Sequence, residues 1–173
     1  MLGRYVERYR SRIIAASVLF LAAFSLGILH AALDPSLPEA LLSELRPLAE
    51  ALVSLGGWKL AAVIFVNNGV KVLGSIVLGT LFGIFPVISL LANGYLIGII
   101  AQYHGPTVFL VGIAPRGILE IPALLLGAGA GIHLGWVALR RRSEVKEEMA
   151  TALGMFLRVI LPLLLAAALI ETF

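Results

Sequence analysis

The sequence predicts an all-α fold: a polytopic membrane helix bundle with about five transmembrane helices, an outer amphipathic helix and one broken helix. Three observations predict it. Of the 173 residues, 60% are hydrophobic and only 13% are charged, the mean hydropathy is +1.02, and apolar runs of membrane length recur along the chain. A soluble domain averages about 45–50% apolar and about 25% charged residues. Lipid must therefore surround the chain, and residues 1–173 are interpreted as a single transmembrane domain.

The first expected span is the apolar run at 13–33, which follows a basic segment at 4–12. Its length of about 21 residues fits a bilayer and exceeds the apolar region of a signal peptide. We therefore expect a retained helix. It should end at Asp34, because the residue before a proline avoids helical geometry.

Residues 36–55 have a different pattern, in which leucines recur at steps of four and three opposite charged side chains. The leucines are Leu41, Leu45, Leu48, Leu52 and Leu55, and the charged residues are Glu39, Glu44, Arg46 and Glu50. This pattern predicts an amphipathic helix on the membrane surface or against the bundle. Protein partners docking there and a plain connector remain alternative roles.

The remaining expected spans are 58–81, 87–102, 107–139 and 149–170. The stretch 107–139 is longer than one span needs, and Pro115, Arg116 and Gly117 interrupt it. We therefore expect a short segment over 107–114, for which a re-entrant path is one option. A break at 115–117 and a full helix to Leu139 should follow.

Arginine positions predict the orientation in the cell membrane. Arginines gather before the first span and again at 140–142. Cytoplasmic loops carry the excess of Lys and Arg in multi-pass proteins. Five spans then place the N terminus in the cytoplasm and the C terminus outside.

Several polar residues fall within the apolar stretches, where unsatisfied polar groups are costly. They are Asn67, Asn68, Lys71, Asn93, Arg116, Glu120 and Arg158. One interpretation is structural: a buried ion pair with the amides as hydrogen-bonding partners between helices. The other is a polar cavity that holds an anion, a lipid headgroup or a proton. Three cations against one carboxylate favour an anionic guest.

Glycines spaced by four residues recur on the predicted helices. They are Gly79 and Gly83, Gly94 and Gly98, and Gly127, Gly131 and Gly135. Small residues at this spacing let membrane helices approach closely. The pattern predicts either a tightly packed bundle or a homodimer through a glycine-lined face.

The sequence favours a protein without catalytic activity. Known catalytic motifs are missing, and Glu120 is the one carboxylate within the predicted spans. His30, His104 and His133 are not spaced to share a metal with each other or with a carboxylate. We therefore expect no metal and no cofactor, and the lack of a basic stripe with aromatics argues against nucleic acid as a partner.

The sequence also resembles the stage II sporulation protein M family of integral membrane proteins over about residues 58–173. The resemblance rests on NN at 67–68, NG with a later glycine at 93–98, and PRGILEIPALLLGAGAGIHLG at 115–135. It carries over to Asn67, Asn68, Asn93, Gly94, Pro115, Gly117, Glu120 and the 127–135 run. Family members usually have Pro-His-Gly where this chain has Pro115-Arg116-Gly117, so a role for an imidazole there does not transfer.

The resemblance implies a polytopic membrane protein and supplies no catalytic residue. In spore formers the sporulation member is a membrane partner of two peptidoglycan-degrading proteins. We therefore expect a membrane anchor or scaffold that organises partner proteins. The alternative is a transporter or channel that moves a small anionic solute or a lipid through the polar cavity.

Overall fold

The computed structural model describes residues 2–109 and 114–172, without the side chains of 114–116 and 171. No strand occurs in this part of the chain. The elements are α1 (Leu2–Leu33), α2 (Ser36–Leu55), α3 (Gly57–Val77), η1 (Leu78–Thr80), α4 (Ile84–Val108), α5 (Ala114–Arg140), η3 (Arg142–Glu144), α6 (Val145–Met155), the π-helical η4 (Phe156–Ile160) and α7 (Leu161–Thr172). Five of the stretches that they form are long and apolar enough to cross a membrane. The predicted fold class is confirmed.

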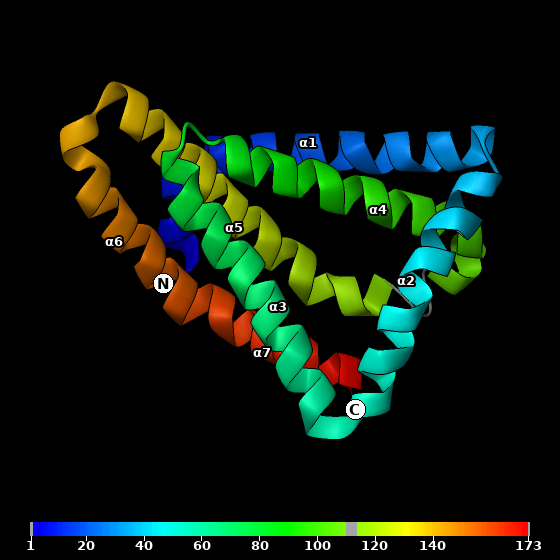
Figure 1. The fold of residues 1–173 in the computed structure, drawn as a ribbon. Coiled ribbons are helices and arrows are strands. Elements are labelled where there is room, and N and C mark those ends of the chain that lie inside the picture. Colours follow the sequence, from blue (N-terminus) through cyan, green and yellow to red (C-terminus); the bar gives the residue numbers. More distant parts are fainter. Residues whose placement is uncertain (1, 110–113, 173) are drawn as a thin grey trace.

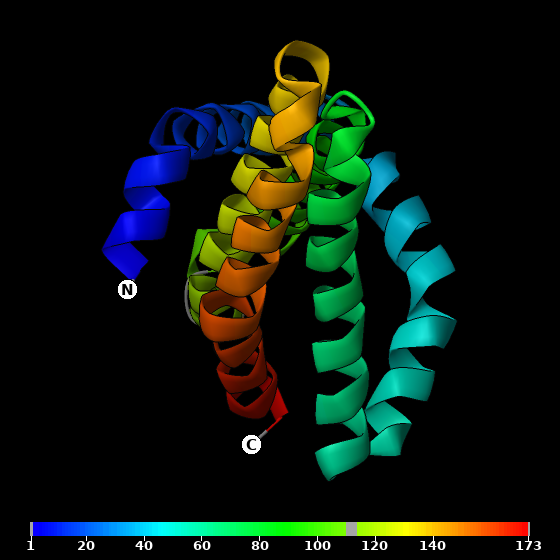
Figure 2. The ribbon, with the colours of Figure 1, turned by 90° about the vertical axis from the view of Figure 1, so that its left-hand side faces the viewer.

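The helices diverge from one end of the molecule. At that end lie the turn between η1 and α4 and the hairpin between α5 and α6, as Figure 1 shows. Helices α1 and α4 pack along each other, α3 packs on α7, and α5 contacts all four of them. Helix α2 crosses the opposite end, from the end of α1 to the start of α3 (Figures 1 and 2).

Helix α5 is the central element of the bundle. In its apolar window 61% of the residues are buried, against 22–33% in the other spans. Ala123, Ala128, Ala130 and Leu134 have no exposed surface. Alanine and glycine dominate this helix because its neighbours approach it on every side, and larger side chains would hold their backbones apart.

Glycine allows a close approach between α5 and the segment formed by the end of α3 and η1. A Cβ atom on Gly79 would lie within 3.0 Å of the Gly131 backbone, and one on Gly131 within 3.0 Å of the Ser75 carbonyl oxygen. A Cβ on Gly135 would meet the backbone of Gly83 in the same way. These two helices therefore touch backbone to backbone.

The pair α1 and α4 has the same kind of contact. Cβ atoms on Gly94 and Gly98 of α4 would lie within 3.0 Å of carbonyl oxygens of α1, and one on Gly27 of α1 would collide with the Tyr95 carbonyl oxygen. Gly127 likewise faces the Val72 side chain. The tightly packed bundle, one of the two predicted uses of the glycines, is what the structure has. Because neighbouring helices of the same chain cover these faces, they offer a homodimer no free surface.

Two boundaries differ from the expectation. Helix α1 begins at Leu2 and includes the basic segment, because arginines are good helix formers and prolong the apolar helix beyond the bilayer. The expected break at 115–117 is wrong: these residues lie in the first turn of α5. Proline is tolerated there because its missing N–H has no intrahelical partner in any case.

Part of the expected segment 107–114 can also be placed. Residues 107–108 continue α4 beyond a kink at Gly105, whose φ of 76° is in the left-handed region that glycine adopts readily. A path for 110–113, re-entrant or not, lies outside the described residues. The amphipathic helix at 36–55 is confirmed with the bounds expected from the sequence.

Candidate functional site: a polar cavity inside the bundle

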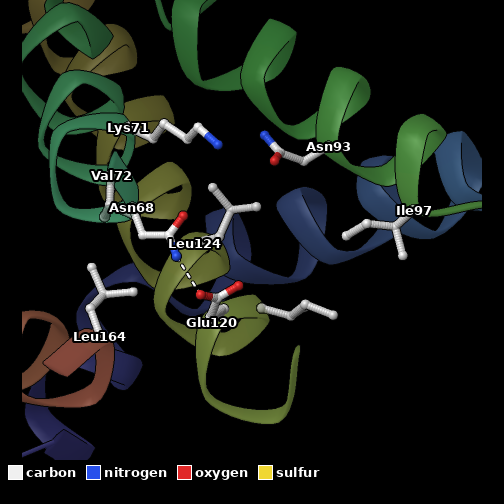
Figure 3. Close-up of a pocket in the computed structure, with 9 residues that line it drawn as sticks. Asn68, Lys71, Val72, Asn93, Ile97, Glu120, Leu124 and Leu164 are labelled. Atoms are coloured by element: carbon white, nitrogen blue, oxygen red, sulfur yellow. Dashed lines mark hydrogen bonds between the residues drawn. The ribbon is translucent and has the colours of Figure 1, made fainter. Parts of the chain in front are cut away.

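Four polar side chains from three helices line a small, partly open cavity between α3, α4 and α5, and Lys71 is exposed at its edge. Its volume is about 50 Å³, and its lining consists of Asn68, Lys71, Val72, Asn93, Ile97, Glu120, Ile121, Leu124 and Leu164. The amide nitrogen of Asn68 on α3 donates a hydrogen bond to the carboxylate of Glu120 on α5. Figure 3 shows this bond, and it shows the Lys71 ammonium group directed toward the Asn93 amide on α4.

Helical spacing explains how α3 supplies this site. Asn68, Lys71, Val72 and Ser75 are three or four residues apart, so they share one side of α3. The Ser75 hydroxyl donates to the Lys71 carbonyl oxygen at 3.0 Å, which removes a free polar group from the interface with α5. On α4, the Asn93 amide nitrogen donates to the Ser89 carbonyl oxygen at 2.7 Å, which directs the side chain along its own helix.

The cavity can hold water molecules next to a cation and an anion. One water occupies roughly 10–15 Å³ of such a volume, so the space of about 50 Å³ admits a few. Lys71 is the cation and Glu120 the anion, while Val72, Leu124 and Leu164 form part of the apolar wall. The arrangement can therefore bind water or a small ion beside the hydrogen-bonded amide and carboxylate.

The structure separates Asn67 from this site. Asn67 is exposed and lines a shallow hollow on the outer side of α3 with Ala62, Val63 and Val66. Asn67, Lys71, Ser75 and Gly79 are spaced by four residues and form a stripe along α3 and η1 that turns by about 40° at each step. It therefore begins on the outer surface at Asn67 and ends buried against α5 at Gly79.

Arg158 also lies away from the cavity. It lines a second pocket at the other side of the bundle, with Arg4, Tyr5, Arg8 and Thr151. The Arg116 side chain lies outside the described residues. The sequence led us to expect three cations and one carboxylate at this site. Among the described residues that line the cavity, the charged ones are Lys71 and Glu120.

A partly buried ionic cluster that the sequence did not predict joins α1 to α6 and α5. The Arg8 guanidinium donates two hydrogen bonds to the Glu148 carboxylate, at 2.6 Å and 3.1 Å. His133 Nε2 lies 3.4 Å from the same carboxylate, without hydrogen-bond geometry. The Tyr9 ring packs edge-on against His133 at 5.2 Å. Sequence spacing could not reveal this cluster, because Arg8 and Glu148 are 140 residues apart.

Neither polar group has the composition of a metal centre. In the described residues, no group of three His, Cys, Asp or Glu side chains could hold a metal ion. His133 and Glu148 meet as a pair, and Glu120 meets an amide.

Comparisons with known proteins agree with this architecture. An uncharacterized protein of Methanocaldococcus jannaschii is 34% identical over 56 residues, which are 32% of this chain and 26% of the relative. The matched part of the chain thus spans about a quarter of that relative's length. No solved structure matches the chain. The family model for stage II sporulation protein M matches residues 16–173, and the chain is therefore an integral membrane protein that belongs to the stage II sporulation protein M family.

Proposed function

We propose that this protein is a non-enzymatic membrane scaffold that binds a partner protein at the end crossed by α2. The observation that carries the proposal is the sparse packing of α2. Its leucines form an apolar face, yet Leu45 is 37%, Leu48 59% and Leu55 42% exposed. A face of this kind on a membrane protein is typical of a site for another apolar surface.

The groove beside α2 defines the chemistry of the partner. It lies between α2 and the end of α4 and has a volume of about 490 Å³; its lining is Glu39, Leu42, Ser43, Leu45, Arg46, Ala49, Tyr103 and His104. Arg46 is paired with Glu50 at 2.8 Å. Glu39 takes part in no ion pair among the described residues. The partner that fits is an amphipathic helix whose apolar side packs on the leucines and whose basic residues reach Glu39 at the groove.

Photo-crosslinking in native membranes tests the scaffold. A photoreactive residue at Leu48 should give one discrete protein adduct. Leu26 on α1 is a matched control, because its side chain is also 59% exposed but lies on a membrane span. We expect lipid adducts from Leu26, and we expect the Leu48 adduct to disappear in Glu39→Lys. Lipid adducts alone at Leu48, or an adduct that survives the charge reversal, would refute the proposal.

We propose further that the scaffold is a homodimer that forms through α3. The Asn67 amide is exposed on a spanning helix, and no hydrogen bond of its side chain occurs among the described residues. An amide facing hydrocarbon is costly, and two copies of one helix can satisfy each other's amides. Val63 and Val66 beside it leave a shallow hollow for the second helix.

The mass of the protein in detergent tests this dimer. Asn67→Leu should convert the dimer to a monomer, whereas Asn67→Gln keeps the amide and should leave the dimer in place. An unchanged mass in Asn67→Leu would exclude this interface.

The alternative function is passage of a small anionic solute or a lipid across the membrane. The polar cavity is the one observation that supports it. Lys71 would supply the cation that attracts an anion there. In liposomes that contain the purified protein, chloride or phosphate flux that is lost in Lys71→Met would favour transport over the scaffold.

The orientation proposed for this scaffold follows from the arginines. The α5–α6 hairpin at 140–142 and the segment that begins α1 should lie in the cytoplasm, at the cell membrane. Helix α2 and the C terminus then lie outside, so the partner would bind from the outer side.

A further inference from the structure

The second pocket is a basic cavity between the beginning of α1 and the helix formed by α6 and η4. Its volume is about 230 Å³, and it is lined by Arg4, Tyr5, Arg8, Thr151 and Arg158. The Tyr5 side chain reaches from α1 to α6, where its hydroxyl lies 3.5 Å from the position that a Cβ on Gly154 would take. The three arginines therefore converge on one space from two helices that are distant in sequence.

The charges in this pocket are not balanced. Glu148 neutralises Arg8 through two hydrogen bonds. No ion pair among the described residues involves Arg4 or Arg158, so the guanidinium groups of these two residues lack the carboxylate partner that Arg8 has in Glu148. Guanidinium groups that share a cavity repel each other unless an anion lies between them.

Arg158 occupies a position where a charge is costly. It lies within the span Arg142–Ile170, nine residues after Met149, where the apolar part of this span begins. A charge at this depth needs an ionic partner or a route to the interface. Side chains on a helix lean toward its N terminus, which for α6 is the end at the α5–α6 hairpin. The Arg158 guanidinium is thus directed toward the headgroup layer on the arginine-rich side.

The backbone around Arg158 is also unusual. Residues Phe156–Ile160 form a π-helical segment. Such segments insert one residue into a helical turn, change the direction of the side chains and occur often at functional sites. Leu157, next to Arg158, is 61% exposed and offers an apolar surface beside the pocket.

We propose that this pocket binds the phosphate group of an anionic phospholipid from the cytoplasmic leaflet. Arg158 and Arg4 each present the planar donor fork that matches phosphate oxygens. The Tyr5 hydroxyl is a further donor, while the Thr151 hydroxyl already donates to the Glu147 carbonyl oxygen and forms part of the wall. An acyl chain attached to the phosphate would lie along Leu157, and free phosphate would gain nothing from that surface.

Native mass spectrometry of the full chain in detergent tests the site. Phosphatidylglycerol is the probe, and phosphatidylcholine, which has no net charge, is its control. Wild-type protein should retain one phosphatidylglycerol molecule. We expect the apparent affinity to fall about fivefold in each of Arg158→Gln and Arg4→Gln, the usual effect of one basic residue near anionic lipid.

Arg142→Gln is the matched control variant. It removes the same charge from the same end of the molecule, at an exposed residue outside the pocket, and should change the affinity less than twofold. Arg4 is exposed on the first turns of α1, so Arg4→Gln reports on binding even where Arg158→Gln disturbs the fold. Equal retention of phosphatidylglycerol by wild type, Arg158→Gln and Arg4→Gln would overturn the proposal.

Two further outcomes decide between the sources of the phosphate. Equal retention of phosphatidylcholine would refute a site for anionic lipid. Inorganic phosphate that binds as tightly as phosphatidylglycerol, with the same dependence on Arg158, would assign the pocket to free phosphate and overturn the lipid proposal. Phosphatidylglycerol that persists in millimolar inorganic phosphate supports it.

Discussion

Arg8 and Glu148, which are 140 residues apart, join α1 to α6 through paired hydrogen bonds of 2.6 Å and 3.1 Å. Arg8 lies at the beginning of α1 and Glu148 at the beginning of α6, on the side of the bundle where the helices converge. The Glu148 side chain is 11% exposed and that of Arg8 42%. The pair therefore fixes the basic N-terminal segment to the bundle, and its Arg8 forms part of the wall of the pocket that Arg158 lines.

The first prediction concerns the strength of this pair. A double-mutant cycle with Arg8→Ala and Glu148→Ala should give a coupling free energy of about 1.5–3 kcal/mol, as for hydrogen bonds to charged groups. Thermal unfolding in detergent measures it. The exposed pair Arg46–Glu50 on α2 is the control and should give about 0.3–0.5 kcal/mol. Equal coupling free energies in the two pairs would show that the partial burial of Glu148 does not strengthen its hydrogen bonds to Arg8.

The second prediction concerns the contact between α3 and α5. Gly131→Ala should destabilise the protein by about 1–3 kcal/mol, because the new Cβ would overlap the Ser75 carbonyl oxygen and force the backbones apart. Gly69→Ala on α3 is the control, since a Cβ there meets nothing within 4 Å. It should be neutral or stabilise by up to about 1 kcal/mol. Melting temperatures that fall equally in both variants would argue against the close contact.

The sequence predicts the helices of this protein better than the contacts between them. The spanning helices and α2 could be predicted because apolar length and leucine spacing are local properties. The different environments of Asn67 and Asn68 could not, because neighbouring helical residues point about 100° apart and the rotation of α3 is set by packing on α5 and α7. The Arg8–Glu148 pair depends on how α1 meets α6, which no local pattern encodes. Arg158 could be recognised as an intramembrane charge, but not assigned to its pocket.

The third prediction tests the amide and carboxylate in the polar cavity. Asn68→Asp should place two carboxylates in contact and destabilise the protein by at least about 2 kcal/mol. Adding Glu120→Gln exchanges the two groups and should restore most of the stability, because an amide can again donate to a carboxylate. Thermal unfolding of the single and double variants measures this. A double variant no more stable than Asn68→Asp would show that the contact between α3 and α5 at this point does not determine stability.

The fourth prediction concerns pH at the start of α2. Asp34 accepts hydrogen bonds from the Ser36 hydroxyl and backbone N–H, and these bonds lower the pKa of its carboxyl group below the ordinary value of 3.8. A lowered pKa in the folded state stabilises the helix start above pH 3.8, and this contribution is lost as the pH falls through the folded pKa. The protection factors of the Ser36 and Leu37 amide hydrogens, which compare their exchange rates with those of an unfolded chain at the same pH, should therefore fall as the pH drops below 3.8. In Asp34→Ala the exchange should be fast already at neutral pH, and a pH dependence that remains in this variant would assign the titration to another group.

The fifth prediction tests the orientation that both proposals require. The chain has no cysteine, so single cysteines report their own accessibility. An impermeant maleimide on intact cells should label Ser54→Cys on α2 and should label Ser143→Cys in the α5–α6 hairpin only after the membrane is opened. Ser75→Cys, at a buried position, is the control for leakage and unfolding and should react in neither case. Labelling of Ser143→Cys in intact cells would show that the protein has the opposite orientation. The arginine pocket would then face the outer leaflet, and α2 would face partners in the cytoplasm.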